Sequence, residues 1–239
     1  GGAGSDAFTL DSNGPSAANG TVDGIVSAVT MNGGGGANML TLEDSTDSAA
    51  NTVTLTGTQV GAGGSDTFFG AGGSLTYSGL NALTLNSGSG NDTVNVTATG
   101  APTTSLNTSG GNDALTITSA RTLTMNGGSG ADTYTVNFGA LSGIATQTDS
   151  GVAGTTDALI ANGTGGVDAF ALTGTQLTRG AETVNYASLE TLTVDALAGN
   201  DTFTVNGNGA AAALTGGDGT DTFTINSTTT GNGVTLNGE

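Results

Sequence analysis

The chain has 239 residues, of which 44 are glycine, and it carries 20 Asp or Glu against 2 Lys or Arg, for a formal net charge of −18. It contains no Cys, His or Trp. These absences exclude a disulfide framework, thiolate or imidazole catalysis, and an ordinary zinc, copper or iron site. With two cations, nucleic-acid binding through phosphate neutralisation is excluded too. No apolar run approaches the ~18 residues of a transmembrane helix.

Short runs in which apolar and polar residues alternate recur along the whole chain. Alternation with a period of two predicts a strand with one buried face, and β-branched threonine suits the exposed face. No segment shows a sustained helical period, so almost no helix is expected. The predicted strands centre, in chain order, on residues 8–10, 40–42, 53–55, 83–85, 94–96, 115–117, 123–125, 134–136, 192–194, 203–205, 223–225 and 234–236.

These strands are short, and segments rich in Gly, Asn, Asp and Ser separate them. An antiparallel sandwich would need longer strands and larger core side chains than 4% aromatic residues supplies. A coil that stacks short strands on their own copies needs only a few apolar side chains per strand. We therefore predict an all-β fold, a right-handed parallel β-solenoid (β-helix) of about ten short-strand rungs. The side chains expected to point inward are Phe8, Leu85, Val94, Leu115, Met125, Tyr134, Val194, Phe203 and Phe223.

A nine-residue motif, Gly-Gly-x-Gly-x-Asp-x-(large apolar)-x, joins a turn to a strand. Residues 1–9, 127–135 and 216–224 match it at every defined position, and residues 87–95 depart from it only at Ser87. Glycine permits left-handed backbone and close packing of neighbouring turns. Related turns carry Asp66, Asp92, Asp113, Asp168 and Asp201, and weaker variants carry Asn38, Asn51 and Asp157 at the acidic position.

A larger repeat spans about half the chain. The sequence LTGTQV at 55–60 returns as LTGTQL at 172–177, and Asn-Asp-Thr at 91–93 returns at 200–202. The end of the chain followed by its beginning closely reproduces the internal run 123–132. The sequence thus predicts a single solenoid segment, 1–239, made of two half-repeats, 6–131 and 132–239, the second continuing into 1–5 of the next unit.

The nonapeptide resembles that of the RTX, or haemolysin-type, calcium-binding β-roll. More loosely, the chain resembles the giant β-strand-repeat surface proteins of bacteria. In the RTX family the Asp side chain and turn carbonyls of neighbouring coils bind Ca²⁺, so the resemblance implies calcium as a cofactor. The family places two nonapeptides in each coil, whereas this chain has one motif per longer rung. The ligands that the resemblance implies here are Asp6, Asp92, Asp113, Asp132, Asp201 and Asp221.

The alternative to metal binding is that each Asp closes a turn on its own backbone. Like charges at the spacing of stacked strands repel one another, so the carboxylates either hold cations between them or splay outward. Both alternatives remain open at this point.

The repeats, the acidity and the lack of reactive side chains favour a non-enzymatic function. We expect the structural repeat unit of an extracellular bacterial fibre, matrix filament or surface stalk, which stacks head-to-tail on copies of itself. The extracellular space or cell surface is expected because millimolar calcium is available there. No nucleic-acid partner and no membrane insertion are expected, and a surface or matrix polysaccharide is a candidate partner. The alternatives are an adhesin that binds a receptor or surface, an ice-binding solenoid with threonine columns at 133/135, 202/204 and 222/224, and a polysaccharide-active β-helix enzyme.

Overall fold

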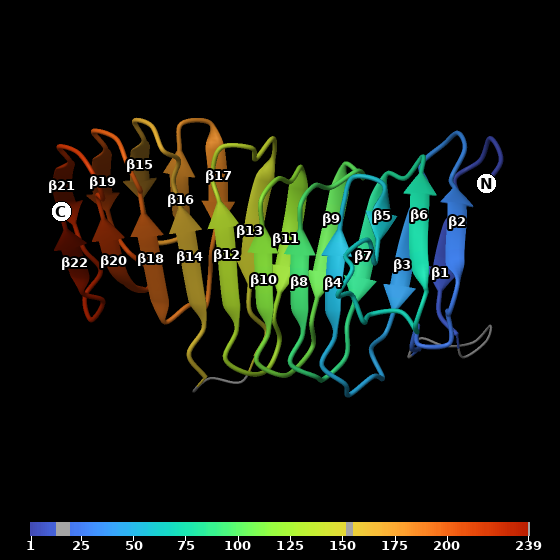
Figure 1. The fold of residues 1–239 in the computed structure, drawn as a ribbon. Helices are drawn as coiled ribbons and strands as arrows, with labels where there is room; N and C mark the ends of the chain where they lie inside the picture. The colour runs from blue at the N-terminus through green and yellow to red at the C-terminus, as the bar shows by residue number, and fades with distance from the viewer. Residues whose placement is uncertain (13–19, 152–154, 239) are drawn as a thin grey trace.

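The computed structural model describes residues 1–12, 20–151 and 155–238. Its strands lie side by side in an elongated body, with the N-terminal strands at one end and the C-terminal strands at the other (Figure 1). This described part contains 22 strands and no helix. The prediction of an all-β fold is therefore confirmed.

The strands form two sheets of 11 strands each. The first sheet contains, in spatial order, β1 (Ala7–Leu10), β3 (Met39–Glu43), β7 (Ala82–Asn86), β9 (Thr103–Asn107), β11 (Thr122–Asn126), β13 (Ile144–Thr148), β17 (Glu182–Asn185), β16 (Gln176–Arg179), β15 (Ala169–Leu172), β19 (Thr202–Asn206) and β21 (Thr222–Ser227). The second contains β2 (Ala28–Asn32), β6 (Ser74–Ser78), β5 (Gln59–Val60), β4 (Thr52–Leu55), β8 (Thr93–Val96), β10 (Ala114–Ile117), β12 (Thr133–Asn137), β14 (Ala158–Asn162), β18 (Thr191–Asp195), β20 (Ala211–Thr215) and β22 (Val234–Asn237).

Over most of its length the chain alternates between the two sheets. From β7 to β14, each strand pairs in parallel with the strand two places earlier or later wherever both belong to this run. The pairing keeps apolar residues in register; Leu85, Leu106 and Met125 are consecutive partners across β7, β9 and β11. Two consecutive short strands, one in each sheet, therefore form a unit, called a coil below, that buries its apolar side chains against the same positions of the next unit.

Two segments run antiparallel, which the expectation of a wholly parallel fold did not include. Strands β4, β5 and β6 form an antiparallel meander in the second sheet, and β15, β16 and β17 form one in the first. The first reversal is a tight turn in which the Thr56 N–H donates to the Gln59 carbonyl at 2.9 Å and the Gln59 N–H donates to Thr56 Oγ1 at 2.9 Å. A threonine that accepts from the backbone in this way favours a turn over a continued strand.

The two meanders correspond to the repeated LTGTQ sequence. The Thr173 N–H donates to the Gln176 carbonyl at 2.9 Å, which repeats the contact of Thr56. A tyrosine hydroxyl closes each turn: Tyr77, in β6, donates to the Thr56 carbonyl, and Tyr186, directly after β17, donates to the Thr173 carbonyl. Because the meanders are 11 strands apart and the chain alternates between sheets, they lie in opposite sheets.

The apolar core runs between the sheets along the whole body. Seven of the nine side chains predicted to point inward are buried, while Phe8 and Phe223 are partly buried because they lie on β1 and β21, the two ends of the first sheet. Consecutive ring centroids in the column Phe138, Phe170, Phe203 and Phe223 are 5.6, 5.4 and 4.8 Å apart.

Candidate functional site

A ladder of polar side chains runs along the edge where strands of the second sheet begin. Each carboxylate accepts the backbone N–H of the equivalent residue in the neighbouring coil. Asp92 N–H donates to Asp113 Oδ1 at 2.7 Å, Asp113 N–H to Asp132 Oδ1 at 2.8 Å, and Asp132 N–H to Asp157 Oδ1 at 2.8 Å. Asn51 N–H precedes this series by donating to Asp92 Oδ1 at 2.8 Å.

The first sheet carries the same arrangement in two pieces. Near the C-terminal end, Asp168 N–H donates to Asp201 Oδ1 at 2.7 Å and Asp201 N–H donates to Asp221 Oδ1 at 2.9 Å. Near the N-terminal end, Asp6 N–H donates to Asn38 Oδ1 at 3.0 Å. The ladder oxygens therefore supply acceptors for backbone N–H groups of the turns that would otherwise have no partner. These hydrogen bonds stabilise the stacking of coils.

The glycines of the nonapeptide leave room for this carboxylate. A Cβ on Gly127, the first glycine of its motif, would lie 2.1 Å from Asp132 Oδ2, and one on Gly216 would lie 2.1 Å from Asp221 Oδ2. In the variant motif Ser87 occupies this position and its hydroxyl contacts Asp92 Oδ2 instead. The motif thus encodes a turn that contains an inward-facing Asp.

All six residues implied as calcium ligands belong to these ladders. Asp92, Asp113, Asp132 and Asp201 are buried, whereas Asp6 and Asp221 are half-buried at the two ends of the first sheet. The ladder brings neighbours together in pairs through the backbone N–H. Five of the six accept an N–H of a neighbouring coil, and Asp6 accepts the Gly2 N–H of its own turn at 3.2 Å.

Burial makes several of these carboxyl groups hard to ionise. Desolvation raises the pKa of Asp113 and of Asp44 from 3.8 to about 7 in each case, although a backbone N–H bond opposes the rise. Desolvation also raises the pKa of Asp92, Asp132 and Asp201. Among the described residues, four buried carboxylate oxygens have no hydrogen-bond partner: Oδ2 of Asp113, Asp132, Asp149 and Asp201.

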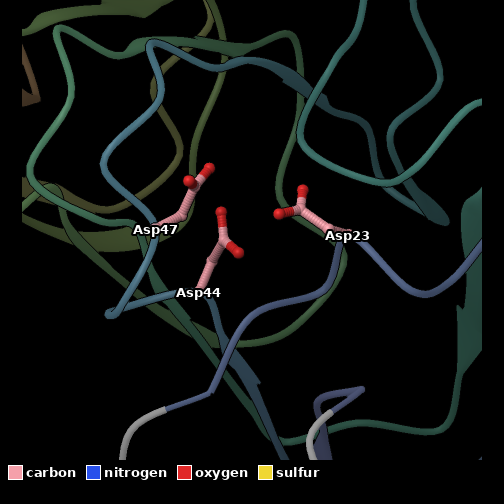
Figure 2. Close-up of side chains that lie close together, drawn as sticks. All are labelled: Asp23, Asp44 and Asp47. Atoms are coloured by element: carbon pink, nitrogen blue, oxygen red, sulfur yellow. The ribbon is translucent and has the colours of Figure 1, made fainter.

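Two groups of three carboxylates come close enough to share a cation. In the first, the carboxylates of Asp23, Asp44 and Asp47 converge, with one oxygen of each within 4.8 Å of the others (Figure 2). Asp44 is wholly buried, but both of its oxygens already accept, from the Val22 N–H at 2.9 Å and from Asn51 Nδ2 at 3.3 Å. Neither oxygen of Asp44 is therefore without a hydrogen-bond partner.

The second group consists of Asp132, Asp149 and Asp157, again with one oxygen of each within 4.8 Å of the others. Asp132 was among the residues implied by the resemblance, whereas Asp149 was not singled out and Asp157 was noted only as a weak motif variant. Two unit charges at this separation repel by about 3 kcal/mol or more at an effective dielectric of about 20. Desolvation and the neighbouring Asp149 carboxyl together raise the pKa of Asp157 to about 6.

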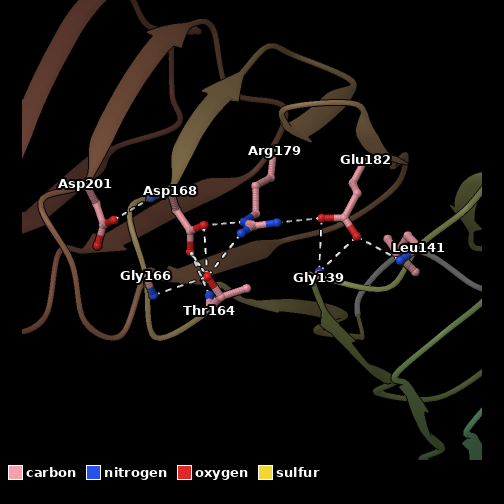
Figure 3. Close-up of polar contacts among 8 residues, drawn as sticks. All are labelled: Gly139, Leu141, Thr164, Gly166, Asp168, Arg179, Glu182 and Asp201. Atoms are coloured by element: carbon pink, nitrogen blue, oxygen red, sulfur yellow. Dashed lines mark hydrogen bonds and ion pairs between the residues drawn. The ribbon is translucent and has the colours of Figure 1, made fainter.

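One arginine neutralises a third acidic group, in the β15–β17 meander. Arg179 Nε contacts buried Asp168, its Nη1 lies 2.8 Å from Glu182 Oε2, and its Nη2 donates to Thr164 Oγ1 at 3.0 Å (Figure 3). Glu182 in turn accepts the Leu141 N–H at 2.7 Å. Because Arg179 joins Asp168, Glu182 and Thr164 through separate nitrogens, this network ties the turn before β15 to β16 and β17.

The threonines that suggested an ice-binding surface form only short columns across neighbouring strands. Thr202 and Thr204 pair with Thr222 and Thr224 in the next strand, but with alanines of β15 on their other side. Thr133 lies between two alanines of the neighbouring strands. These columns are therefore short.

No protein-family model matches the sequence, and no curated protein matches it. The likeness to RTX repeats accordingly depends on the nonapeptides alone. The part of the chain that the structure describes contains no helix with the length and apolarity needed to cross a membrane.

Proposed function

We propose that the chain is a right-handed parallel β-solenoid, interrupted by two meanders, and that it is the structural repeat unit of an extracellular bacterial filament, matrix or stalk. Alternation between two sheets and parallel pairing of every second strand support the solenoid. The right-handed sense follows from the strong preference of parallel crossover connections. The function proposed is mechanical and non-enzymatic, with units stacked head-to-tail.

The observation that carries this proposal is the apolar, uncovered end formed by β21 and β22. Ile225 pairs in register with Val205, and Leu236 pairs with Leu214. Val205 is 0% exposed and Leu214 1%, yet Ile225 is 40% exposed and Leu236 43%. Core positions of β21 and β22 are therefore partly exposed in the part of the chain that the structure describes, and an uncovered sheet end of this kind invites strand addition.

The opposite end is also apolar. Phe8, Leu10, Val29 and Met31 occupy inward positions of β1 and β2 but are only partly buried. Together with Leu40 and Leu75 behind them, they line an apolar cavity of about 200 Å³. Both ends expose the same two-sheet cross-section, so one end of a second copy fits the other.

A second copy of the sequence, as a continuing chain or as a separate molecule, is therefore the proposed neighbour. In this register β1 of the next copy pairs with β21, and β2 pairs with β22. Phe8 of that copy continues the ring column beyond Phe223, and its Asp6 follows Asp221 in the carboxylate ladder. The ladder of the first sheet, and both sheets, would then run through the junction without a break.

Calcium is the proposed stabilising cation, and the extracellular space or cell surface the proposed location. The two carboxylate groups could hold a metal ion, and weak oxygen-ligand sites fill only where calcium is millimolar. Because the net charge is −18, copies of the chain repel one another, and bound cations would reduce this repulsion. Adhesion to a surface polysaccharide remains a partner hypothesis for the same filament.

The test is association of the 239-residue chain in solution and in electron micrographs. The double variant Ile225→Lys/Leu236→Lys places charges on the uncovered end and should abolish end-to-end particles. The matched control Ile144→Lys/Val167→Lys changes two exposed apolar residues away from the ends, 46% and 72% exposed, and should still associate. A wild-type chain that remains monomeric at high protein and salt concentration, with both ends intact, contradicts the proposal.

A further inference from the structure

The carboxylate group of Asp132, Asp149 and Asp157 lies where two neighbouring coils meet. Asp132 precedes β12, Asp157 precedes β14, and β12 and β14 are adjacent parallel strands of the second sheet. Asp149 comes from the connection that follows β13. One carboxylate oxygen of each residue lies within 4.8 Å of the others. Oxygens that bind one Ca²⁺ at 2.3–2.6 Å lie at most about 5 Å apart, so the spacing suits a shared ion.

A second observation, independent of this clustering, is that the site has unused acceptors. Asp132 is 0% exposed, and its Oδ2 has no hydrogen-bond partner although its Oδ1 accepts the Asp113 N–H. The buried Oδ2 of Asp149 has none either, while its Oδ1 accepts the Gly151 N–H at 2.6 Å. Buried acceptors without partners are costly, and ones that converge are typical of a site for a ligand that supplies positive charge.

The Asp23–Asp44–Asp47 group lacks this feature, because both Asp44 oxygens are hydrogen-bonded and Asp47 accepts from Asn51 Nδ2 at 2.6 Å. The chain also has few cationic side chains that could neutralise these carboxylates. It has only two cationic side chains, and one of them, Arg179, is taken up by Asp168 and Glu182.

We propose that Asp132, Asp149 and Asp157 bind one Ca²⁺, which ties the β13–β14 connection to the turn before β12. Three carboxylates supply part of the six to eight oxygens that Ca²⁺ takes, and backbone carbonyls and water supply the others. The all-oxygen donor set excludes a site built for zinc or copper. This inference deepens the calcium part of the proposed function, but it does not depend on head-to-tail stacking.

Calorimetric titration of the chelator-treated 239-residue chain with CaCl₂ tests the site. We expect a site with a dissociation constant of about 10⁻⁴–10⁻³ M, as in extracellular modules. Asp149→Asn should weaken it at least tenfold, because the amide keeps the oxygen that accepts the Gly151 N–H but removes the charge. The matched control Asp218→Asn removes one charge from an exposed turn and should leave the affinity unchanged.

Terbium luminescence locates the ion. The Tyr134 hydroxyl accepts the Gly127 N–H at 2.6 Å, and a Cβ on Gly127 would lie 2.1 Å from Asp132 Oδ2 and 2.5 Å from the Tyr134 hydroxyl oxygen. Tb³⁺ in the site should therefore emit when tyrosine is excited, and Tyr134→Phe should remove most of this emission while calorimetry still detects calcium. Should Asp149→Asn fail to fold by circular dichroism, Asp157→Asn, which keeps the oxygen that accepts the Asp132 N–H, replaces it.

The outcomes separate this site from the wider proposal. No heat of binding up to about 10 mM calcium overturns the site. Calcium binding that is indifferent to Asp149→Asn and Asp157→Asn also overturns it and places the ion elsewhere. Binding that depends on these residues in a chain that never associates supports the site and counts against head-to-tail stacking.

Discussion

The backbone N–H of Asp113 donates to Oδ1 of Asp132 at 2.8 Å, and these two residues occupy equivalent positions in neighbouring coils. Through this bond one oxygen of a buried carboxylate links two neighbouring coils. Elsewhere in the same chain the neutral amide of Asn38 has this function, accepting the Asp6 N–H through Oδ1 at 3.0 Å. The ladder therefore needs an oxygen at this position but not a negative charge.

Asp113→Asn should stabilise the metal-free protein at pH 8. Asn keeps the oxygen that accepts the Asp92 N–H at 2.7 Å, and an uncharged NH₂ group replaces the buried carboxylate oxygen that has no hydrogen-bond partner. Removal of a desolvated charge should raise the free energy of unfolding by about 1 kcal/mol or more, or Tm by about 2–4 °C. The gain should shrink as the pH falls and vanish only below the ordinary pKa of 3.8, where Asp113 is protonated in both the folded and the unfolded chain. A variant less stable than the wild type at pH 8 contradicts the argument.

Asp113→Ala is the matched control for the hydrogen bond. It removes the charge and the acceptor together, so the Asp92 N–H loses its partner in a buried turn. Relative to Asp113→Asn, which loses the charge but keeps the acceptor, the expected cost is about 1–3 kcal/mol, and it should appear at pH 5 as well as at pH 8.

The metal-free protein should lose stability as the pH rises from about 4 to about 7. Burial raises the pKa of Asp44 and Asp113 from 3.8 to about 7 and that of Asp157 to about 6, so within this window the folded chain holds more protons than the unfolded chain. The free energy of unfolding therefore falls with pH there and levels off above it. Urea unfolding in chelator at pH 5, 6, 7 and 8 measures the trend. A midpoint that rises over this range would show that these carboxyl groups ionise normally.

Gly130→Ala should be far more destabilising than other substitutions of an exposed turn. Gly130 has a φ of +135°, and a Cβ there would lie 1.6 Å from the Gly111 carbonyl oxygen of the neighbouring coil. Backbone must move to admit the methyl group, so a loss of about 3 kcal/mol or more is expected. The control is Gly174→Ala, where nothing lies within 4 Å of the added Cβ and the effect should be within about 1 kcal/mol. Equal effects in thermal melts would contradict close stacking of the turns.

Alternation along the sequence placed 12 of the 22 described strands but did not give their direction. Leu83-Thr84-Leu85 predicts one buried face, and Leu83 and Leu85 are buried in β7. The repeat LTGTQ was visible too, yet a period of two is the same for parallel and antiparallel strands. Only the contacts of Thr56 and Thr173 with the backbone show that these segments turn back.

The ladder and the three-carboxylate group involve residues that are far apart in the sequence. The motif identified Asp132 because its glycines and its acidic residue are contiguous. Asp149 lies beyond β13, and loop lengths, which vary from coil to coil, determine whether it returns to Asp132. The acceptor of the Asp113 N–H likewise belongs to the next coil, so no local pattern could reveal it.

The two arginines offer a direct comparison between a clamped and an exposed cation. Arg179 is 21% exposed and binds Asp168, Glu182 and Thr164 through separate nitrogens, while Arg121 is exposed. Arg179→Met should cost about 2–4 kcal/mol, because it leaves the buried charge of Asp168 without its partner. Arg121→Met should change stability by less than about 0.5 kcal/mol.

A second substitution distinguishes lost charge from lost packing. If uncompensated Asp168 is the cause, Asp168→Asn added to Arg179→Met should recover part of the loss, since the amide keeps an oxygen that can accept the Thr164 N–H, now bonded to Asp168 Oδ2 at 2.6 Å. If the aliphatic stem of Arg179 is what matters, Met supplies much of it and the single variant should already be close to wild type. Urea unfolding of the two single variants and the double variant gives the coupling energy. The two residues act independently if the double variant is less stable than Arg179→Met by the full cost of Asp168→Asn alone. In that case the contact between them does not hold the β15–β17 meander in place.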